Sequence, residues 1–458
     1  MTAIRVVRHD EHTTDPLFDE IRATEFGRLD ADNQAYLDYT GSALYSETQI
    51  TAHAERMRRV ILGNPHSENG PSLVSTAIIN EAKARLLGFL DAPASEYVVC
   101  FTANTTAAIK LVAESFPFDE GSPLILSTDN HNSMNGVREF ARSKGAAVHY
   151  VPLDANLRLK GARSILANTA GNGGLLGYPA QSNFSGVKHS LELIDTAQRL
   201  GYSVLLDAAA FLPANSLSLR KYPADFVALS MYKITGYPTG VGALVAKRDS
   251  LAKLQRPWFA GGTVEYASVQ HGTHMLRKSN GEAFEDGTPA FLSIAAVTDG
   301  LEFLEGIGMD RINLHVTRHA NRFRDELASL RNRCGGPLIR FYGQGAPADC
   351  GATLAFNVIG SDGTPIPFSR VVERARNEGV SLRGGCFCNP GASESAFEFQ
   401  PDATSRCFRS ARERGFSIER FSECLGPSVP VGAVRASMGV ATSNRDLERA
   451  VSVIASFA

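Results

Sequence analysis

The chain of 458 residues, 43% hydrophobic and 21% charged, has the composition of a globular protein and is long enough for two domains, because single cores stop growing near about 250–300 residues. Its 46 basic and 48 acidic residues nearly balance, which gives no electrostatic indication of nucleic acid or an anionic membrane as a partner. The charged start MTAIRVVRHDEHTTD lacks the apolar stretch of a signal peptide and no apolar run approaches the ~20 residues that span a bilayer, so we expect a cytoplasmic protein.

Short β-rich runs alternate with helical stretches between about residues 95 and 250. The expected strands are EYVVCF (96–101), PLILST (123–128), AAVHYVPL (146–153), SILANT (164–169), SVLLDAAA (203–210), FVALS (226–230) and VGALVAK (241–247). Helices are expected at TTAAIKLVAESF (105–116) and near 133–144. Near-continuous apolar strands separated by helices indicate an α/β fold whose mainly parallel sheet is covered on both faces, with ligands at the carboxyl ends of the strands.

The C-terminal part predicts a smaller α+β domain. After residue 290 a long helical stretch is expected to bridge into it, and it contains the strands ATLAFNVIG (352–360) and GAVRASMGV (432–440) with helices at 368–380 and 444–457. The segment 391–431, rich in Ser, Arg, Phe and Pro, is expected to be an irregular insertion. We therefore predict an N-terminal segment (1–50) that packs with the small domain and the active site, a large domain (51–310) and a small domain (311–458).

The seven cysteines are an odd number spread over a long chain, which is typical of reduced thiols rather than of a disulfide framework. Only Cys386 and Cys388 are close neighbours, and a zinc site would need a second short-spaced pair. His271 and His274 could add ligands, but the spacing does not favour a metal site, and we expect none.

An aspartate and a lysine fall at or just past two expected strand ends, Asp207 in LDAAAF and Lys233 in LSMYK. Pyridoxal 5′-phosphate (PLP) needs an amine for its Schiff base and a carboxylate that keeps its pyridine nitrogen protonated, and this pair could supply both. Ser230 precedes the lysine by three residues and is well placed for the cofactor phosphate. Considered separately, Lys233 is more simply explained as a surface lysine and Asp207 as an aspartate at the end of a strand.

Ten stretches of the sequence, in order along nearly the whole chain, carry a family resemblance. They are YLDYTGSALYS (36–46), NPHS (64–67), FTANTTAAIKLVAE (101–114), DNHNS (129–133), PAQSNFSGVK (179–188), LLDAAAF (205–211), YKITGYPTGVGALV (232–245), FEDGTP (284–289), GCFCNPGA (385–392) and AVRASMG (433–439). In them the chain resembles the class V aminotransferase group of fold-type-I PLP enzymes, and most of all the N-terminal cysteine desulfurase domain of molybdenum cofactor sulfurases. The resemblance implies PLP as the cofactor and a fold-type-I architecture.

The resemblance also implies roles for single residues. Thr105 and Thr106, at a helix start after a strand, would bind the phosphate, although threonine there is also an ordinary N-cap. His131 would stack on the pyridine ring. Asn183 would hydrogen-bond the ring hydroxyl or the substrate. Each of the last two is otherwise a loop residue.

Two further residues would act at the edges of the site. Thr288 would reach the phosphate of the other subunit's cofactor, which makes a homodimer the expected working unit; in isolation it is a turn residue. Arg435 would bind the α-carboxylate of an amino-acid substrate, since planar guanidinium donors match a carboxylate; its simpler alternative is a surface arginine on an edge strand.

The GCFC segment decides which reaction the resemblance implies. Cys388 aligns with the nucleophile of cysteine desulfurases, which takes the sulfur of L-cysteine as a persulfide and leaves alanine, while Lys233 moves the Cα proton. Cys386 aligns with a position that is His in several bacterial desulfurases, and Arg383 could assist the charge of the thiolate. Flanking glycines and Pro390 predict a mobile loop that carries the persulfide away.

Some positions depart from the family pattern. Tyr232 and Ala210 replace a common His and Gln, as in molybdenum cofactor sulfurases, but Ser393 stands where those carry Cys, and we expect no counterpart of their C-terminal domain for molybdenum cofactor. We therefore predict a PLP-dependent cysteine desulfurase-like enzyme that passes sulfur to an acceptor protein or small molecule. The alternatives are a C–S β-lyase, epimerase or aminotransferase of specialised metabolism, or a non-catalytic protein of this fold. A dehydrogenase is disfavoured because no GxGxxG turn follows the first strand.

Overall fold

The computed structural model describes residues 15–170, 173–277, 281–343, 349–413 and 415–458. The first fourteen residues, which hold nearly all of the charged start and belong to the expected N-terminal segment, lie outside the described residues. Among the described residues, no helix is both long enough and apolar enough to cross a membrane.

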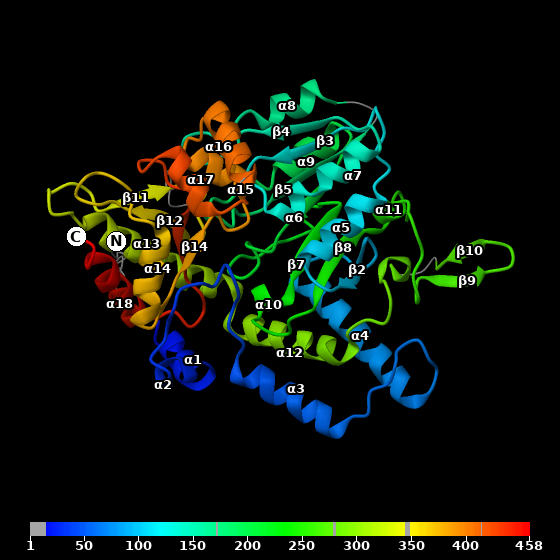
Figure 1. Cartoon of the computed structure of the whole chain (residues 1–458). Helices are drawn as coiled ribbons and strands as arrows, with labels where there is room; N and C mark the ends of the chain where they lie inside the picture. The colour runs from blue at the N-terminus through cyan, green and yellow to red at the C-terminus, as the bar shows by residue number, and fades with distance from the viewer. Residues whose placement is uncertain (1–14, 171–172, 278–280, 344–348, 414) are drawn as a thin grey trace, which may run out of the picture.

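A seven-stranded sheet lies at the centre of the larger half of the molecule (Figure 1). Its strands, in spatial order, are β2 (Tyr97–Thr102), β8 (Gly242–Lys247), β7 (Phe226–Ser230), β6 (Tyr202–Asp207), β5 (Gly174–Pro179), β3 (Leu124–Ser127) and β4 (Val148–Val151). The strands from β7 to β4 in this order are parallel to one another, and only β8 runs antiparallel to both of its neighbours. The predicted α/β fold with a mainly parallel sheet is confirmed.

Both faces of this sheet are buried, as the continuous apolar runs predict. Along β2, Tyr97, Val99 and Phe101 belong to one apolar cluster, whereas Val98 and Cys100 belong to another, because successive strand side chains point to opposite faces. The accompanying helices are α4 (Gly70–Phe89), α5 (Thr105–Ser115), α6 (Asn132–Asn135), α7 (Val137–Ser143), α8 (Ala162–Asn168), α9 (Leu193–Arg199), α10 (Met231–Ile234), α11 (Arg248–Leu251), η1 (Glu282–Phe284) and α12 (Phe291–Ile307).

One predicted strand is wrong. The segment SILANT lies in helix α8, and the real strand is β5, ten residues further on. The glycines of β5 lower its strand propensity in sequence, but the fold needs them: a Cβ on Gly174 would lie 2.5 Å from the carbonyl oxygen of Pro123, and one on Gly177 would lie 2.7 Å from the sulfur of Met134. Close packing in the buried centre of the sheet thus overrides local propensity.

The smaller half is built on a four-stranded antiparallel sheet. Its spatial order is β11 (Ile339–Tyr342), β12 (Thr353–Val358), β15 (Ala433–Ser437) and β14 (Arg383–Gly385), and α13 (Met309–Ser329), α14 (Phe368–Asn377) and α18 (Asn444–Ala455) accompany it. The N-terminal helices are α1 (Pro16–Glu25), α2 (Arg28–Ala31) and α3 (Glu47–Arg59). Strand β1 (Ala35–Tyr36) pairs with β13 (Val380–Ser381), and Asp38 bridges to Ser437, so the N-terminal segment lies against this sheet.

The segment 391–431 is not irregular, as predicted, but largely helical. It contains most of α15 (Pro390–Ala396), then α16 (Pro401–Glu413) and α17 (Ile418–Leu425). Helix α16 buries Cys407 and Ala411, and its arginines are exposed. The polar composition therefore belongs to amphipathic helices, not to a loop.

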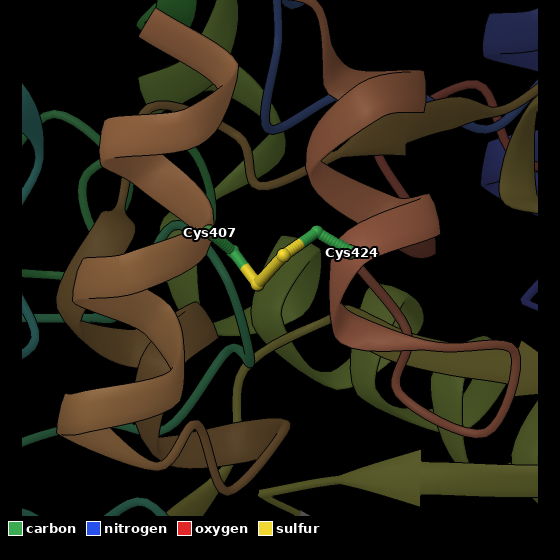
Figure 2. The surroundings of a disulfide bond; sticks show 2 residues. All are labelled: Cys407 and Cys424. Carbon is green, nitrogen blue, oxygen red and sulfur yellow. A yellow bond between two sulfur atoms is a disulfide. The ribbon is translucent and has the colours of Figure 1, made fainter.

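A disulfide between Cys407 and Cys424 joins α16 to α17 (Figure 2), so the prediction of uniformly reduced thiols is wrong. The two Cα atoms are 5.5 Å apart, within the normal range for a disulfide. The spacing of the cysteines in the sequence does not predict this pairing, because it forms only when the two helices pack against each other. Cys100, Cys334, Cys350, Cys386 and Cys388 remain free thiols.

A β-hairpin of β9 (Val264–Ser268) and β10 (Thr273–Leu276) projects from the larger half (Figure 1). His271 and His274 lie on it and are exposed. In the part of the chain that the structure describes, no group of three or more His, Cys, Asp or Glu side chains is arranged to hold a metal ion.

Candidate active site

The carboxyl ends of β6 and β7 open into a cavity of about 210 Å³. Asp207 is the last residue of β6, Ser230 is the last residue of β7, and Lys233 lies in the single turn of α10 that follows. The predicted residues that line this cavity are Thr105, Thr106, His131, Asn183, Asp207, Ser230 and Lys233. Cys388, Arg435 and Thr288 are not among the residues that line it.

The surroundings of Lys233 favour a neutral amine. Burial lowers its pKa, and the positive charges of Arg435 and Arg383 add to this effect, whereas the Asp207 carboxylate opposes it. A lysine must lose its proton before it can attack a carbonyl carbon, so this shift suits a Schiff-base lysine. Asp207 is buried and accepts a hydrogen bond from the amide of Ala209 at 3.0 Å.

Hydroxyl groups gather at the N-terminus of α5. The Oγ of Ser230 lies 2.9 Å from the amide nitrogen of Thr105, which donates to it, and 2.5 Å from the Oγ of that threonine. The hydroxyls of Thr106 and Ser133 are 2.7 Å apart. An eleven-residue helix directs its positive dipole end here, so these groups form a suitable binding place for a phosphate.

His131 is held in a defined orientation at the start of α6. Its Nδ1 accepts a hydrogen bond from the amide of Ser133 at 3.1 Å, which leaves the proton of a neutral ring on Nε2. Burial lowers the pKa of His131; the charge of Asp207 opposes this, and those of Lys233 and Arg435 add to it. The imidazole is therefore neutral at pH 7 and can lie against an aromatic ring.

The segment 386–389 contacts the larger half through hydrogen bonds to its backbone carbonyl groups. The side-chain Nδ2 of Asn183 donates to the carbonyl of Phe387 at 2.7 Å, and the amide of Asn132 donates to the carbonyl of Cys388 at 2.7 Å. Phe387 and Asn389 are buried, while the side chains of Cys386 and Cys388 are exposed.

The flanking glycines serve packing as well as conformation, and the mobility of this segment stays a prediction. A Cβ on Gly391 would collide with the carbonyl oxygen of Thr128, and one on Gly384 would lie 2.5 Å from the ring of Phe368. Phe387 and Cys388 themselves have φ of 54° and 56°, a left-handed conformation that is unfavourable for residues with a side chain. Strain of this kind is retained where the surroundings enforce it, and it is frequent at functional sites.

Asn183 has a different set of partners from the one predicted. Besides its bond to Phe387, its Oδ1 accepts from Asn389 at 3.0 Å and its carbonyl accepts from Arg435 at 2.8 Å. Asn183 thus lines the cavity, but its side-chain oxygen accepts a hydrogen bond from the Cys388 segment. Its role toward a ring hydroxyl or a substrate stays a prediction.

Arg435 is buried next to the cavity, with 2% of its surface exposed, so the alternative of a surface arginine is wrong. Its Nη2 donates to Asp38 at 2.9 Å, and its guanidinium lies over the ring of Phe387 at 4.8 Å. Arg383 also donates to Asp38, at 2.6 to 3.0 Å, so its charge is directed at this carboxylate.

Thr288 is exposed and lies in the turn before α12, away from the cavity of its own chain. A role toward the same chain's site is therefore not supported. Its predicted contact with a second subunit stays a prediction.

The residues of the cavity fit PLP chemically. An amine and a carboxylate lie at neighbouring strand ends, hydroxyls surround a helix N-terminus, and the imidazole of His131 lines the same cavity. The family model for class V aminotransferases matches residues 35–450. The chain belongs to the class V aminotransferase family. Enzymes of this family use PLP, and Lys233 would hold it here, with Asp207 at its ring nitrogen and the α5 N-terminus at its phosphate.

Several known proteins are similar to this chain. Molybdenum cofactor sulfurase from Solanum lycopersicum is 37% identical over 407 residues, which are 82% of this chain and 50% of that protein. The chain spans about half the length of the curated relatives it matches, between 50% and 59%. A cysteine desulfurase from Thermococcus onnurineus NA1 has the same fold, with a TM-score of 0.78, 22% identity and coverage of 100% and 99% of the two chains.

A second solved structure with this fold is the cystine C–S lyase C-DES, with a TM-score of 0.71 and 16% identity over 94% of this chain and 100% of that one. These likenesses confirm the fold-type-I architecture of class V aminotransferases. At such low identities they do not distinguish cysteine desulfuration from C–S lyase activity.

Sequence reasoning missed three polar residues at the site. Ser133 links His131 to Thr106, Asp38 joins two arginines, and Asp129 anchors the Cys388 segment. All three lie within stretches that carry the family resemblance, DNHNS and YLDYTGSALYS, so the signal was present. Their partners, however, are mostly distant in sequence, and only the fold reveals them.

Proposed function

We propose that this class V aminotransferase is a cysteine desulfurase-like enzyme that takes sulfur from L-cysteine or a related sulfur amino acid. The observation that carries the proposal is the docking of Cys388, a free and exposed thiol, on the amide of Asn132 beside His131. The charge of Cys388 also contributes to the pKa of Lys233, which supports proximity of the thiol to the cavity.

When bound, PLP supplies the electron sink that makes the Cα proton of the amino acid removable. Lys233, whose pKa is lowered by burial, accepts this proton and later returns one to the carbon skeleton. Asp207 would keep the ring nitrogen protonated, and the Thr105 and Ser230 groups would orient the phosphate.

The sulfur step belongs to Cys388. Its thiolate attacks the sulfur of L-cysteine, an S–S bond forms, and the Cβ–S bond breaks with its electron pair left on carbon, which takes a proton. L-cysteine and the Cys388 thiol thus become L-alanine and a Cys388 persulfide. An acceptor protein or small molecule then removes the outer sulfur.

The test compares Cys388→Ser with Cys386→Ser in the holoenzyme, and alanine formed from L-cysteine is measured together with the persulfide on the tryptic peptide. We expect Cys388→Ser to abolish both products with PLP binding intact, and Cys386→Ser, the matched control on the same segment, to retain them. Full alanine release by Cys388→Ser would refute the persulfide role of this cysteine.

A C–S β-lyase is the second candidate, because its reaction does not require Cys388 to move. A lyase needs no protein nucleophile that moves, so fixed contacts to Phe387, Cys388 and Asn389 would not hinder it. Formation of pyruvate and ammonia from L-cystine by both serine variants, at the rate of the unchanged enzyme, would select this alternative.

We also propose that the enzyme works as a homodimer. Thr288 lies outside the cavity of its own chain, and exposed apolar side chains such as Tyr266, Val269 and Met275 line the projecting hairpin. Sedimentation equilibrium should give a mass of twice 49.2 kDa, and an active monomer would refute the proposal. The cytoplasmic location stays a prediction that cell fractionation tests. The exclusion of nucleic acid and membrane partners likewise stays a prediction.

A further inference from the structure

Asp38 binds two arginines with one carboxylate at the edge of the candidate site. Its Oδ1 accepts from Nη2 of Arg435 at 2.9 Å, and its Oδ2 accepts from Nη2 of Arg383 at 2.6 Å and from Nε at 2.8 Å. Two positive charges and one negative charge leave a net charge of +1 in this group.

Three segments of the chain hold these three residues together: β14, β15 and the stretch from Asp38 to Gly41. The register of β14 and β15 places Arg383 directly opposite Arg435, and Asp38 bridges to Ser437, two residues beyond Arg435 on the same strand. The turn after Asp38 folds over its carboxylate, since a Cβ on Gly41 would lie 2.6 Å from both the Asp38 and the Arg383 side chains. The arrangement is therefore built by the fold rather than by two flexible surface chains.

Burial makes the charge balance of this group important. The side chains of Arg435 and Asp38 are 3% and 13% exposed, and that of Arg383 is 49% exposed. Charges interact more strongly where water is excluded, so adding or removing one charge near Arg435 affects ligand affinity more than at the surface. The buried Nε of Arg435 has no hydrogen-bond partner among the residues that the structure describes, which leaves this guanidinium incompletely satisfied there.

We infer that Asp38 determines substrate specificity by charge: it restricts the site to amino acids with a single carboxylate. This inference rests on the proposed function and on the role that the family resemblance predicts for Arg435, as the partner of the substrate α-carboxylate. One α-carboxylate neutralises the net charge of +1. A second anionic group on the substrate would find Arg383 already neutralised by Asp38 and would add an unbalanced negative charge.

The test measures binding of L-alanine and L-aspartate to the holoenzyme, by titration of its visible absorption and by the rise in melting temperature that each ligand causes. The unchanged enzyme should favour L-alanine. Asp38→Asn keeps the shape and one acceptor oxygen but raises the net charge to +2, so the affinity for L-aspartate relative to L-alanine should rise about tenfold. An unchanged ratio would overturn the inference and leave Asp38 a structural residue.

Arg383→Gln provides an independent measurement in case Asp38→Asn does not fold. It lowers the net charge to zero, so both amino acids should bind more weakly, and L-aspartate should lose more than L-alanine. In Asp38→Asn with Arg383→Gln the net charge returns to +1, and the preference for L-alanine should return with it. Binding of L-alanine to Arg383→Gln with unchanged affinity would refute the charge account.

The matched control is Asp299→Asn, which weakens a partly buried arginine–aspartate pair elsewhere, where Arg56 donates to both carboxylate oxygens at 2.7 Å. It should leave the ratio of the two affinities unchanged. Neither ligand carries sulfur, so the two affinities can be measured even if L-cysteine is not a substrate. Conversely, the assay of alanine formed from L-cysteine tests the proposed function whatever the titrations show.

Discussion

Asn389 on the Cys388 segment donates a hydrogen bond at 2.6 Å from its Nδ2 to the Oδ1 of Asp129, although the two residues are 260 positions apart. Asp129 is fully buried, and it also accepts from the hydroxyl of Ser182 at 2.8 Å and contacts Nε2 of His189 at 2.9 Å. One buried carboxylate thus links the nucleophile segment to the larger half of the molecule.

Replacement of Asn389 by Ala should destabilise the protein and loosen the segment that carries Cys388. The buried Asp129 carboxylate loses a donor, which costs about 1–3 kcal/mol. Urea unfolding measures the free energy, and the rate of Cys388 alkylation measures the loosening, which should increase. Asn168→Ala, on the exposed face of α8, should change the free energy of unfolding by less than about 0.5 kcal/mol. Equal effects of the two changes would contradict the anchoring role.

Replacement of Lys233 by Ala should remove the covalent attachment of PLP. After borohydride reduction, mass spectrometry of the unchanged protein should find the cofactor on the peptide that contains Lys233, and the variant should show none. Lys188→Ala, outside this cavity, should stay labelled. Cofactor fixed to another lysine in the unchanged protein would show that the assignment of Lys233 is wrong.

Acid should destabilise the fold through His315. Burial lowers the pKa of this histidine from 6.5 to about 3, with a further lowering from His319. Between these two values the unfolded chain binds a proton that the folded chain does not, so the contribution of the neutral ring is complete above pH 6.5 and decreases as the pH falls toward 3. The melting temperature of His315→Gln should therefore depend less on pH than that of the unchanged protein. Parallel pH curves for the two proteins would exclude His315 as the source.

Removal of the disulfide by Cys424→Ser should destabilise the α16–α17 pair. The bond closes a loop with a sequence separation of 17, for which chain entropy alone gives about 3 kcal/mol. Limited proteolysis should cut between the two helices faster in the variant. Cys334→Ser, at an exposed free thiol, is the control and should match the unchanged protein. Identical proteolysis of Cys424→Ser would show that helix packing alone holds the pair.

The sequence predicts the elements whose burial and propensity agree, and fails where they conflict. FVALS and VGALVAK are apolar, β-prone and buried, and both are strands. Strand β5 was missed because its packing requires glycines, and α16 was missed because one buried stripe among arginines and serines resembles a loop.

The sequence likewise predicts some residues of the candidate site and misses others. Lys233 and Asp207 follow from strand ends, which are visible in the sequence. Asp38, Asp129 and the two disulfide cysteines have partners that only folding brings near. Asp38, for example, is 345 and 397 positions from Arg383 and Arg435, and sequence spacing does not predict contacts at such separations.

The reversal of β8 limits how this protein can evolve around Lys233. The chain leaves β7, forms α10 and returns as β8, which pairs with β7 on one side and β2 on the other. An inserted or deleted residue within β8 would shift this strand in register against two neighbours at once and turn its side chains to the wrong faces. Diversification of the reaction is therefore expected in the segments around Cys388 and Asp38, while the length of β8 stays fixed.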